Sequence, residues 1–357
     1  MKNLLYSKMK IFHYMKKIDS LQISQKEIIS PIHIRIKPTN ICNHNCKYCA
    51  YRSDNLQLGK DMKQNDVIPK DKMFEIIDDL NEMNVKAVTF SGGGDPFCYP
   101  YLIDAIKKIS KTNIKFAALT NGSKLEGEIA ELFSNYGTWI RISIDGWDQQ
   151  SYADYRNTSI KGFENVISNI INFKKLKGKC FLGASIIVDK HNNKHLTELS
   201  LKLSEAGVDS IKFSPCIVDN DAEKNNEYHR LIYDTVKDQI SKVKEKLKSH
   251  NIEIFDSYHL LNAKFNKNYD WCPYIQILPI IGADCNVYSC QDKAYNLEKG
   301  IIGSIKSKSF KEFWFEDKKK FFLINPSVDC LHHCISNEKN NLILQYINSD
   351  KDHLEFV

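Results

Sequence analysis

The stretch Thr39-Asn40-Ile41-Cys42-Asn43-His44-Asn45-Cys46-Lys47-Tyr48-Cys49 places three cysteines in a CxxxCxxC loop, directly after the first predicted strand. Three thiolates at this spacing can ligate three irons of a four-iron cluster and leave the fourth iron open. An open iron binds a small molecule, just as a catalytic zinc keeps a free position. A zinc site completed by His44 is the alternative, although zinc sites usually use paired CxxC or Cys/His units.

Short β-branched runs alternate with amphipathic stretches on both sides of this loop. The strand-like runs are 32–38, 87–91, 114–120, 138–144, 181–188 and 210–215, and the helix-like stretches are 70–83, 101–110, 125–134, 162–176 and 193–206. Six β-then-α repeats predict a parallel sheet covered by helices, and the spacing leaves open whether it forms a barrel or a doubly wound sheet. In both folds the chemistry sits in the loops at the carboxyl ends of the strands.

The composition narrows the class of protein. The chain of 357 residues has 42% hydrophobic residues, as a globular enzyme does, and a net charge of +6 that would suit an anionic substrate. Its lysines form no basic block, and no apolar run approaches 18 residues, so we expect neither nucleic-acid binding nor a membrane span. Eleven cysteines without an export signal favour metal ligation in a reducing compartment, and hence a cytoplasmic protein.

The cysteine loop, including the aromatic Tyr48 before its last cysteine, resembles the signature of the radical S-adenosylmethionine (SAM) superfamily. The resemblance implies a partial (β/α)6 TIM-like barrel and a [4Fe-4S] cluster at Cys42, Cys46 and Cys49. In that family the open iron chelates SAM, and one electron releases a 5′-deoxyadenosyl radical that removes hydrogen from a substrate. The cofactor then carries the hard chemistry, while the protein orients and shields it.

Three further motifs match the family at suitable intervals. Ser91-Gly92-Gly93-Gly94-Asp95 resembles the GGE-type motif that receives the SAM amino group, although Asp95 stands where Glu is common. Glycines in such a motif let the backbone approach a ligand closely. The resemblance also implies SAM contacts from Asn121 and Ser143, and from Arg156 to the carboxylate. Their alternatives are a plain turn at Asn121-Gly122 and a surface cation at Arg156.

A second set of cysteines follows in a region with little material for a hydrophobic core, which predicts a small domain stapled by metal. The run 282–290 resembles the start of a SPASM or twitch domain, with Cys285 where the family usually has Gly. The resemblance implies one auxiliary [4Fe-4S] cluster, the twitch arrangement. Its predicted ligands are Cys272, Cys290, Cys330 and Cys334. The wide CxxxC spacing of the last pair leaves the spare cysteine undecided, and a four-thiolate zinc is the alternative.

Cysteines outside the two sets are candidates for a catalytic hydrogen donor. Cys216 ends the sixth strand, Cys98 follows the glycine motif, and Cys285 adjoins a predicted ligand. A thiol at any of these places would serve an epimerase. A small buried hydrophobe is the alternative for Cys98, Cys180 and Cys216.

The expected organisation is an N-terminal extension (1–30), a radical SAM barrel (31–250), an auxiliary-cluster domain (251–336), and a closing helix and tail (337–357). We expect an oxidoreductase or epimerase that acts on a small hydroxylated substrate such as a sugar, aminocyclitol or glycan precursor, with nucleotide- and phosphate-linked forms open. The short segment before the barrel leaves no room for a peptide-recognition domain. The resemblance further implies a flavodoxin- or ferredoxin-type electron donor. Peptide modification, and a non-catalytic metal protein, are the competing functions.

Overall fold

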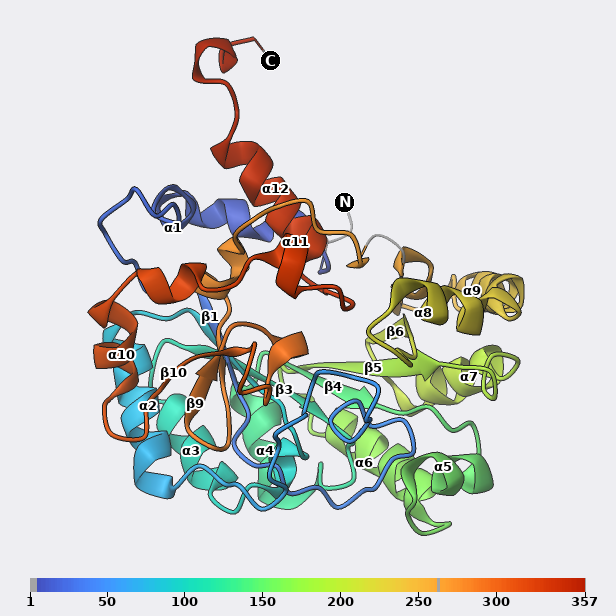
Figure 1. Ribbon diagram of the computed structural model, residues 1–357. Helices are drawn as coiled ribbons and strands as arrows, with labels where there is room; N and C mark the ends of the chain where they lie inside the picture. The colour runs from blue at the N-terminus through green and yellow to red at the C-terminus, as the bar shows by residue number, and fades with distance from the viewer. Residues whose placement is uncertain (1–4, 262–263, 357) are drawn as a thin grey trace.

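The computed structural model, which describes residues 5–261 and 264–356, folds around one curved sheet of ten strands in the order β10-β9-β8-β1-β2-β3-β4-β5-β6-β7 (Figure 1). Six predicted strands appear as β1 (His33–Ile36), β2 (Ala87–Phe90), β3 (Lys115–Thr120), β4 (Trp139–Ser143), β5 (Phe181–Val188) and β6 (Ser210–Pro215). Each pairs in parallel with the next along the chain. A seventh strand, β7 (Glu253–Asp256), continues the parallel order beside β6.

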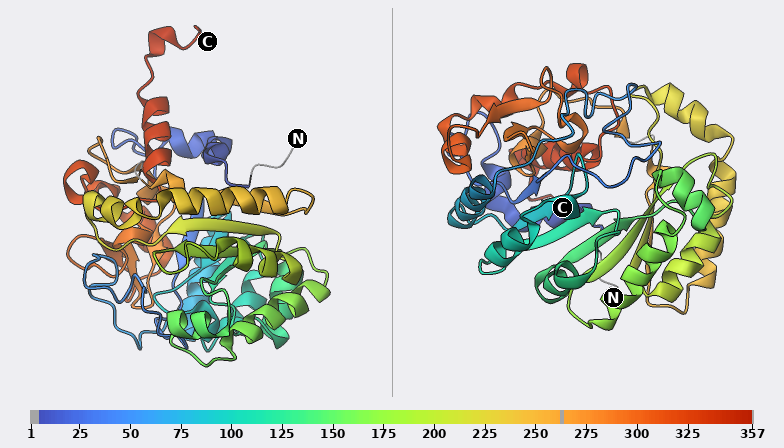
Figure 2. Two further views of the ribbon diagram at one scale, coloured as in Figure 1. Left: turned by 90° about the vertical axis from the view of Figure 1, so that its right-hand side faces the viewer. Right: turned by 90° about the horizontal axis from the view of Figure 1, so that it is seen from below.

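Helices cover the outer face of this sheet, so the molecule is a partial barrel rather than a doubly wound sheet (Figure 2). The covering helices are α2 (Lys70–Glu82), α3 (Leu102–Ile109), α4 (Gly127–Tyr136), α6 (Gly162–Lys175), α7 (Leu196–Ala206) and α9 (Tyr233–Lys246). Side chains of a strand alternate between faces, and the outward ones, such as Ile140 and Ile142, are fully buried under the helices. The predicted (β/α)6 barrel is therefore confirmed.

The C-terminal region extends the same sheet at the edge of β1. Strand β8 (Ile280–Ile281) pairs with β1 in parallel, and β9 (Asn286–Tyr288) and β10 (Ile301–Ser304) follow in antiparallel. The remaining C-terminal elements are α10 (Phe310–Glu316), α11 (Pro326–Asp329) and α12 (Asn337–Ile347). The region thus closes part of the gap in the barrel.

The opposite, amino-terminal ends of the strands lie under the two ends of the chain. A 3₁₀ segment (Lys8–Tyr14) and α1 (Met15–Asp19) pack with α12 through a small cluster that contains Ile11, Ile18 and Ile343. Figure 1 shows α1 and α12 at this end, and the loops at the carboxyl ends of the strands at the other.

The sequence analysis missed three elements of the barrel. Strand β7 has four half-buried residues with an acid at each end, so it lacks the apolar run that marks the other strands. Helix α5 (Gln149–Arg156) is short and polar, and it begins with a capping box between Asp148 and Ser151. The third missed element is helix α8 (Ala222–Arg230), which precedes α9. In the described part of the chain, no helix combines the length and apolar character that a membrane span requires.

Candidate active site

The cysteine loop lies directly against the glycine motif. The amide of Gly94 donates to the Thr39 carbonyl at 3.2 Å, and the Asp95 amide donates to the Ile41 carbonyl at 3.0 Å. A Cβ atom on Gly94 would stand 2.1 Å from the Ile41 carbonyl oxygen, and one on Gly93 would stand 2.4 Å from the Asn40 side-chain oxygen. Gly94 is therefore required for the cysteine loop to sit where it does, whereas a side chain at position 93 would displace the Asn40 side chain.

Asp95 joins the loop after β2 to the loop after β3. Its buried carboxylate accepts from the Thr120 hydroxyl at 2.9 Å, from the Asn121 amide at 2.6 Å and from the Phe97 amide at 2.9 Å. The Asn121 side chain in turn donates to the Asn43 side chain, inside the cysteine loop, at 2.9 Å. The chain itself thus occupies the Asp95 carboxylate, which fixes the two loops relative to each other.

The three thiols of the loop are half-buried and meet donors from the surrounding chain. The His44 amide points at Cys42 Sγ at 3.5 Å, and Arg156 Nη1 points at Cys46 Sγ at 3.7 Å. Hydrogen bonds to the sulfur ligands are typical of iron–sulfur sites, where they tune the cluster. The loop therefore fits an iron–sulfur cluster with three protein ligands.

Asp145 organises the floor of this site, although the sequence analysis did not single it out. This fully buried carboxylate, which follows β4, accepts from Arg156 Nη2 at 2.5 Å, from the Ile187 amide at 2.6 Å and from the Tyr48 hydroxyl. It thereby ties the cysteine loop to α5 and β5. Arg156 is a buried member of this ion pair, not the surface cation of the alternative interpretation.

Replacing Asp145 with alanine is expected to destabilise the fold, because the Arg156 guanidinium would then stay buried without its counter-charge. Loss of one partner from a buried pair costs about 3–5 kcal/mol. Denaturant unfolding of the metal-free protein measures this, with Glu131→Ala, an exposed change on α4, as control. A loss of less than about 1 kcal/mol, the range of an exposed pair, would contradict this account of the Asp145–Arg156 pair.

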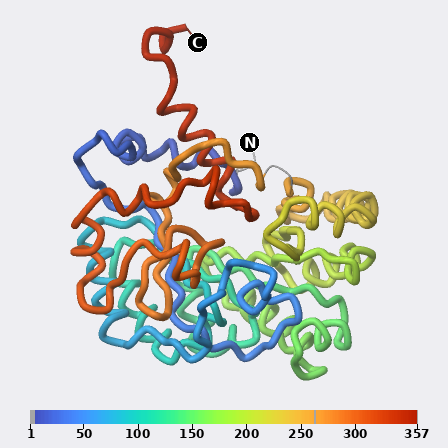
Figure 3. Tube along the Cα trace, in the orientation of Figure 1, coloured from blue at the N-terminus to red at the C-terminus, as the bar shows by residue number. Residues whose placement is uncertain are grey.

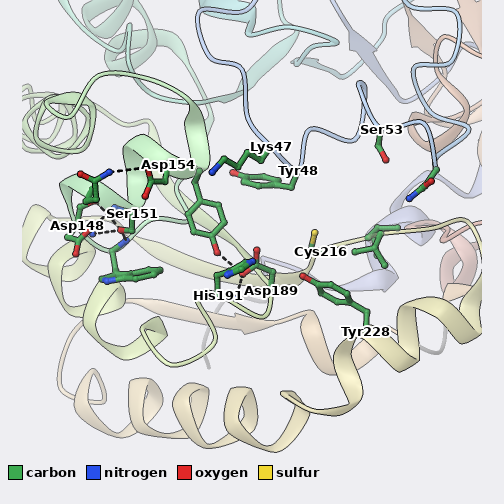
Figure 4. A pocket seen from close by; sticks show the side chains of 16 residues that line it. Lys47, Tyr48, Ser53, Asp148, Ser151, Asp154, Asp189, His191, Cys216 and Tyr228 are labelled. Carbon is green, nitrogen blue, oxygen red and sulfur yellow. Dashed lines mark hydrogen bonds between the residues drawn. The ribbon is translucent and has the colours of Figure 1, made fainter.

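A cavity of about 670 Å³ opens beside the cysteine loop at the carboxyl ends of β4, β5 and β6 (Figure 4). Tyr48 and Lys47 line it from the cysteine loop, and Cys216 lines it from the end of β6. On its wall the Tyr155 hydroxyl donates to Asp189 at 2.6 Å. The other lining residues are Ser53, Asn55, Trp147, Asp148, Gln150, Ser151, Asp154, His191, Ile217, Val218 and Tyr228.

The other residues proposed from the sequence lie in three different places. Ser143 is half-buried at the carboxyl end of β4, in register with Ser185 of β5. Cys98 lies beside the cysteine loop, where its thiol meets the Asn43 side chain at 3.6 Å. Cys285 is buried in the main hydrophobic core, and it does not line the large cavity. Of the three candidate thiols, Cys216 alone lines this cavity.

The four cysteines predicted as auxiliary ligands come together around one small cavity, although they span more than sixty residues of sequence. Cys272, Cys290, Cys330 and Cys334 all line it, whereas Cys285 does not. The Asn340 side chain donates to Cys272 Sγ at 3.2 Å. Across the described ranges, no group of three or more His, Cys, Asp or Glu side chains is placed to hold a single metal ion. The four thiols thus share one small cavity, as the ligands of one metal centre would.

Lys37, at the end of β1, connects the two cysteine sites and was also missed. It is fully buried, and its ammonium donates to the Gly92 carbonyl at 3.2 Å, to Gln291 Oε1 at 3.0 Å and to the Tyr51 hydroxyl. Tyr51 follows the last cysteine of the loop by two residues, and Gln291 directly follows Cys290. The basic residues His33, Arg35 and Lys37, which alternate with isoleucines along this segment, are the signal that could have revealed it.

Comparison with known proteins agrees with this geometry. Residues 36–201 match the family model described as "Radical SAM superfamily". The cysteine-type anaerobic sulfatase-maturating enzyme of Clostridium novyi is 24% identical over 83% of each chain. The S-adenosylmethionine-dependent nucleotide dehydratase of Psychrobacter lutiphocae is 22% identical over 72% of this chain and 90% of that protein.

Among solved structures, native anSMEcpe with bound AdoMet superposes with a TM-score of 0.61 at 18% identity. The match covers 88% of this chain and 97% of that one, so it extends beyond the barrel into the cysteine-rich C-terminal region. The matched family model, the three-cysteine loop and the second cysteine site lead to one conclusion. Residues 36–201 thus form a radical SAM domain, the domain of a superfamily whose members bind SAM and an iron–sulfur cluster, and an auxiliary-cluster region follows the barrel.

Proposed function

We propose that this enzyme removes a hydrogen atom from a small hydroxylated substrate, such as a sugar, aminocyclitol or glycan precursor, and so dehydrogenates or epimerises it. The observation that carries the proposal is the large cavity, which Cys216 and the cysteine-loop residue Tyr48 both line. Its volume of about 670 Å³ is in the range of small-molecule sites. Hydroxyl, amide and carboxylate groups dominate its polar lining, and such groups suit a substrate rich in hydroxyls.

Two groups would supply the chemistry here: a [4Fe-4S] cluster at Cys42, Cys46 and Cys49, and SAM, whose reductive cleavage gives a 5′-deoxyadenosyl radical. The chain's own residues position and shield the reaction. The proposed SAM contacts lie on the cysteine loop and at the strand ends nearest to it: Tyr48, Gly92, Gly93, Gly94, Asp95, Asn121 and Ser143. Arg156, which pairs with Asp145 and points at Cys46 Sγ, is the proposed contact for the SAM carboxylate.

Cys216 is suited to return a hydrogen atom to a substrate radical. Burial, with a smaller contribution from Asp189 and Asp145, raises the pKa of its thiol to about 12. At neutral pH it therefore keeps its S–H bond, and Figure 4 shows its sulfur directed into the cavity. An epimerase needs such a donor, whereas a dehydrogenase does not.

The two outcomes are expected to separate in deuterated water. With SAM, dithionite and a panel of sugars, aminocyclitols and sugar nucleotides, an epimerase gives a product of unchanged formula that has gained one deuterium, and a dehydrogenase gives a product that has lost two hydrogens. For epimerisation, Cys216→Ala should end product formation, while Cys98→Ala and Cys285→Ala should retain it. If all three variants keep full turnover, the hydrogen-donor role is wrong and dehydrogenation is favoured.

Peptide modification is the second candidate, and the similarity to the Clostridium novyi maturase over 83% of both chains favours it. Incubation with a cysteine-containing peptide distinguishes the candidates. A mass change in the peptide, with no change in any small molecule of the panel, would favour the peptide as substrate and contradict the first proposal.

The remaining parts of the proposal concern electrons and location. One auxiliary cluster at Cys272, Cys290, Cys330 and Cys334, the twitch arrangement, would accept the electron left after hydrogen removal. A flavodoxin- or ferredoxin-type protein would reduce the first cluster.

All eleven cysteines are free thiols, which suits a reducing compartment, and we therefore propose a cytoplasmic location.

A further inference from the structure

The inner wall of the barrel carries cations from three strands. Arg35 of β1, Arg141 of β4 and Lys212 of β6 are half-buried, while their neighbours along each strand are fully buried against the covering helices. Because successive side chains of a strand point to opposite faces, these three cations face the interior that the helices leave free. The right-hand view of Figure 2 shows the helices outside the curved sheet.

The chain satisfies these cations only in part. Arg35 Nη1 donates to the neutral Gln291 side chain at 2.8 Å, and Arg141 Nη2 donates to the Tyr6 hydroxyl at 2.8 Å. The Nε atoms of both guanidinium groups are buried and have no hydrogen-bond partner among the described residues. An unsatisfied buried donor on a charged group is costly, so two of them on the inner wall of the barrel indicate a missing acceptor.

Charge repulsion points the same way. Burial, together with the positive charges of Arg141, Lys264, Lys339 and Arg35, lowers the pKa of Lys212 to about 7. Asp292 is a carboxylate near Arg35, but it also interacts with Lys37 and Lys267. Positive charges therefore dominate around Lys212, and an anion would compensate them.

The cations lie deeper in the barrel than the proposed reaction site. Lys212 and Cys216 are four residues apart, and the extended strand pairing of β6 continues as far as Cys216, whose amide donates to the Val188 carbonyl of β5. Both side chains therefore lie on the same face. At about 3.3 Å per residue this separation is about 13 Å along the strand. Long Lys and Arg side chains shorten this gap, so a substrate that extends along the strand would bring a reacting carbon to Cys216 and an acidic group to the cations.

We propose that Arg35, Arg141 and Lys212 bind a phosphate or carboxylate group of the substrate inside the barrel. The inference rests on the proposed function, since it assumes that a small-molecule substrate enters the interior of the barrel. Guanidinium groups match both kinds of oxyanion through paired, charge-assisted hydrogen bonds, and Lys212 adds a point charge. The substrate class narrows to small hydroxylated acids: sugar phosphates, nucleotide-linked sugars or sugar acids.

Calorimetric titration of the reconstituted, SAM-loaded protein with inorganic phosphate, and separately with acetate, tests this inference without turnover. Saturating SAM keeps its own carboxylate site occupied. We expect saturable binding of at least one anion, weakened tenfold or more in Lys212→Met and in Arg141→Gln. Lys237→Met, an exposed change on α9, should bind like the wild type. Binding of phosphate alone would assign a phosphate ester, and binding of acetate as well would assign a carboxylate.

The inference is overturned if the wild type binds neither anion, or if two folded variants, Lys212→Met and Arg141→Gln, both bind as the wild type does. Circular dichroism checks that each variant is folded. If one of them does not fold, the other is sufficient for the test. Formation of 5′-deoxyadenosine from SAM and dithionite tests the proposed function separately. Anion binding through Lys212 without that product would contradict the function alone, and that product without anion binding would contradict the inference alone.

Discussion

Cys42→Ala is expected to reduce 5′-deoxyadenosine formation from SAM and dithionite to the level of the metal-free protein. Cys42 supplies one of three thiols on a single loop, and two thiols cannot hold a four-iron cluster with one open iron. Iron bound after anaerobic reconstitution should fall from about eight to about four atoms per chain, because two four-iron clusters become one. Liquid chromatography of the nucleoside, together with iron analysis, measures both effects.

Cys180→Ala is the matched control for this variant. Cys180 is a buried thiol just before β5, packed in the hydrophobic core away from both cysteine sites. Its loss should leave both clusters in place. Undiminished 5′-deoxyadenosine formation by Cys42→Ala would contradict the assignment of the cysteine loop, and would direct attention to Cys98, the thiol beside it.

The auxiliary site gives the second large effect, through a pair of cysteines five residues apart. Cys290→Ala is expected to lose about four irons per chain, whereas Cys285→Ala should keep all of about eight. The reason is placement: Cys290 lines the cavity shared by the four thiols, and Cys285 is enclosed in the hydrophobic core. Cys290→Ala should also lower the thermal stability of the reconstituted protein, because metal binding contributes to folding in such regions.

Iron and sulfide analysis of the two reconstituted variants checks this prediction. Zinc in place of iron in the wild type would revive the four-thiolate zinc alternative. Iron loss from Cys285→Ala, with retention in Cys290→Ala, would reverse the assignment that the structure favours for these two residues.

The barrel strands were predictable because each carries a β-branched run with an apolar outer face. The elements that the sequence analysis missed lack such a signal: β7 is four half-buried residues, and α5 is almost wholly polar. Their places are set by tertiary contacts, β7 by pairing with β6 and α5 by the Asp145–Arg156 pair. Contacts of that kind override local propensity.

The same distinction holds for the site. The cysteine loop and the glycine motif are local patterns, so their residues could be named from the sequence. Asp145 could not be named from the sequence, because its role depends on contacts with Tyr48, 97 residues earlier, and with the Ile187 amide on another strand. The grouping of Cys272 with Cys290, Cys330 and Cys334 was proposed from a family resemblance, and the cavity that they share is visible only in three dimensions.

The cations of the inner wall show a further limit of sequence patterns. Arg35, Arg141 and Lys212 each interrupt a strand, and singly each resembles an ordinary polar residue on a half-exposed face. Only the curvature of the sheet brings the three strands around one barrel interior. The positive charge of the whole chain suggested an anionic substrate without saying where it would bind.

Electron paramagnetic resonance of the dithionite-reduced Cys290→Ala protein, with and without SAM, tests the central claim most directly. This variant should hold only the cluster of the cysteine loop, so its spectrum reports on that site alone. We predict a [4Fe-4S]⁺ signal whose g-values change when SAM is added, since SAM would bind the iron that no side chain reaches. A signal that ignores SAM, or a colourless protein filled with zinc, would contradict the claim.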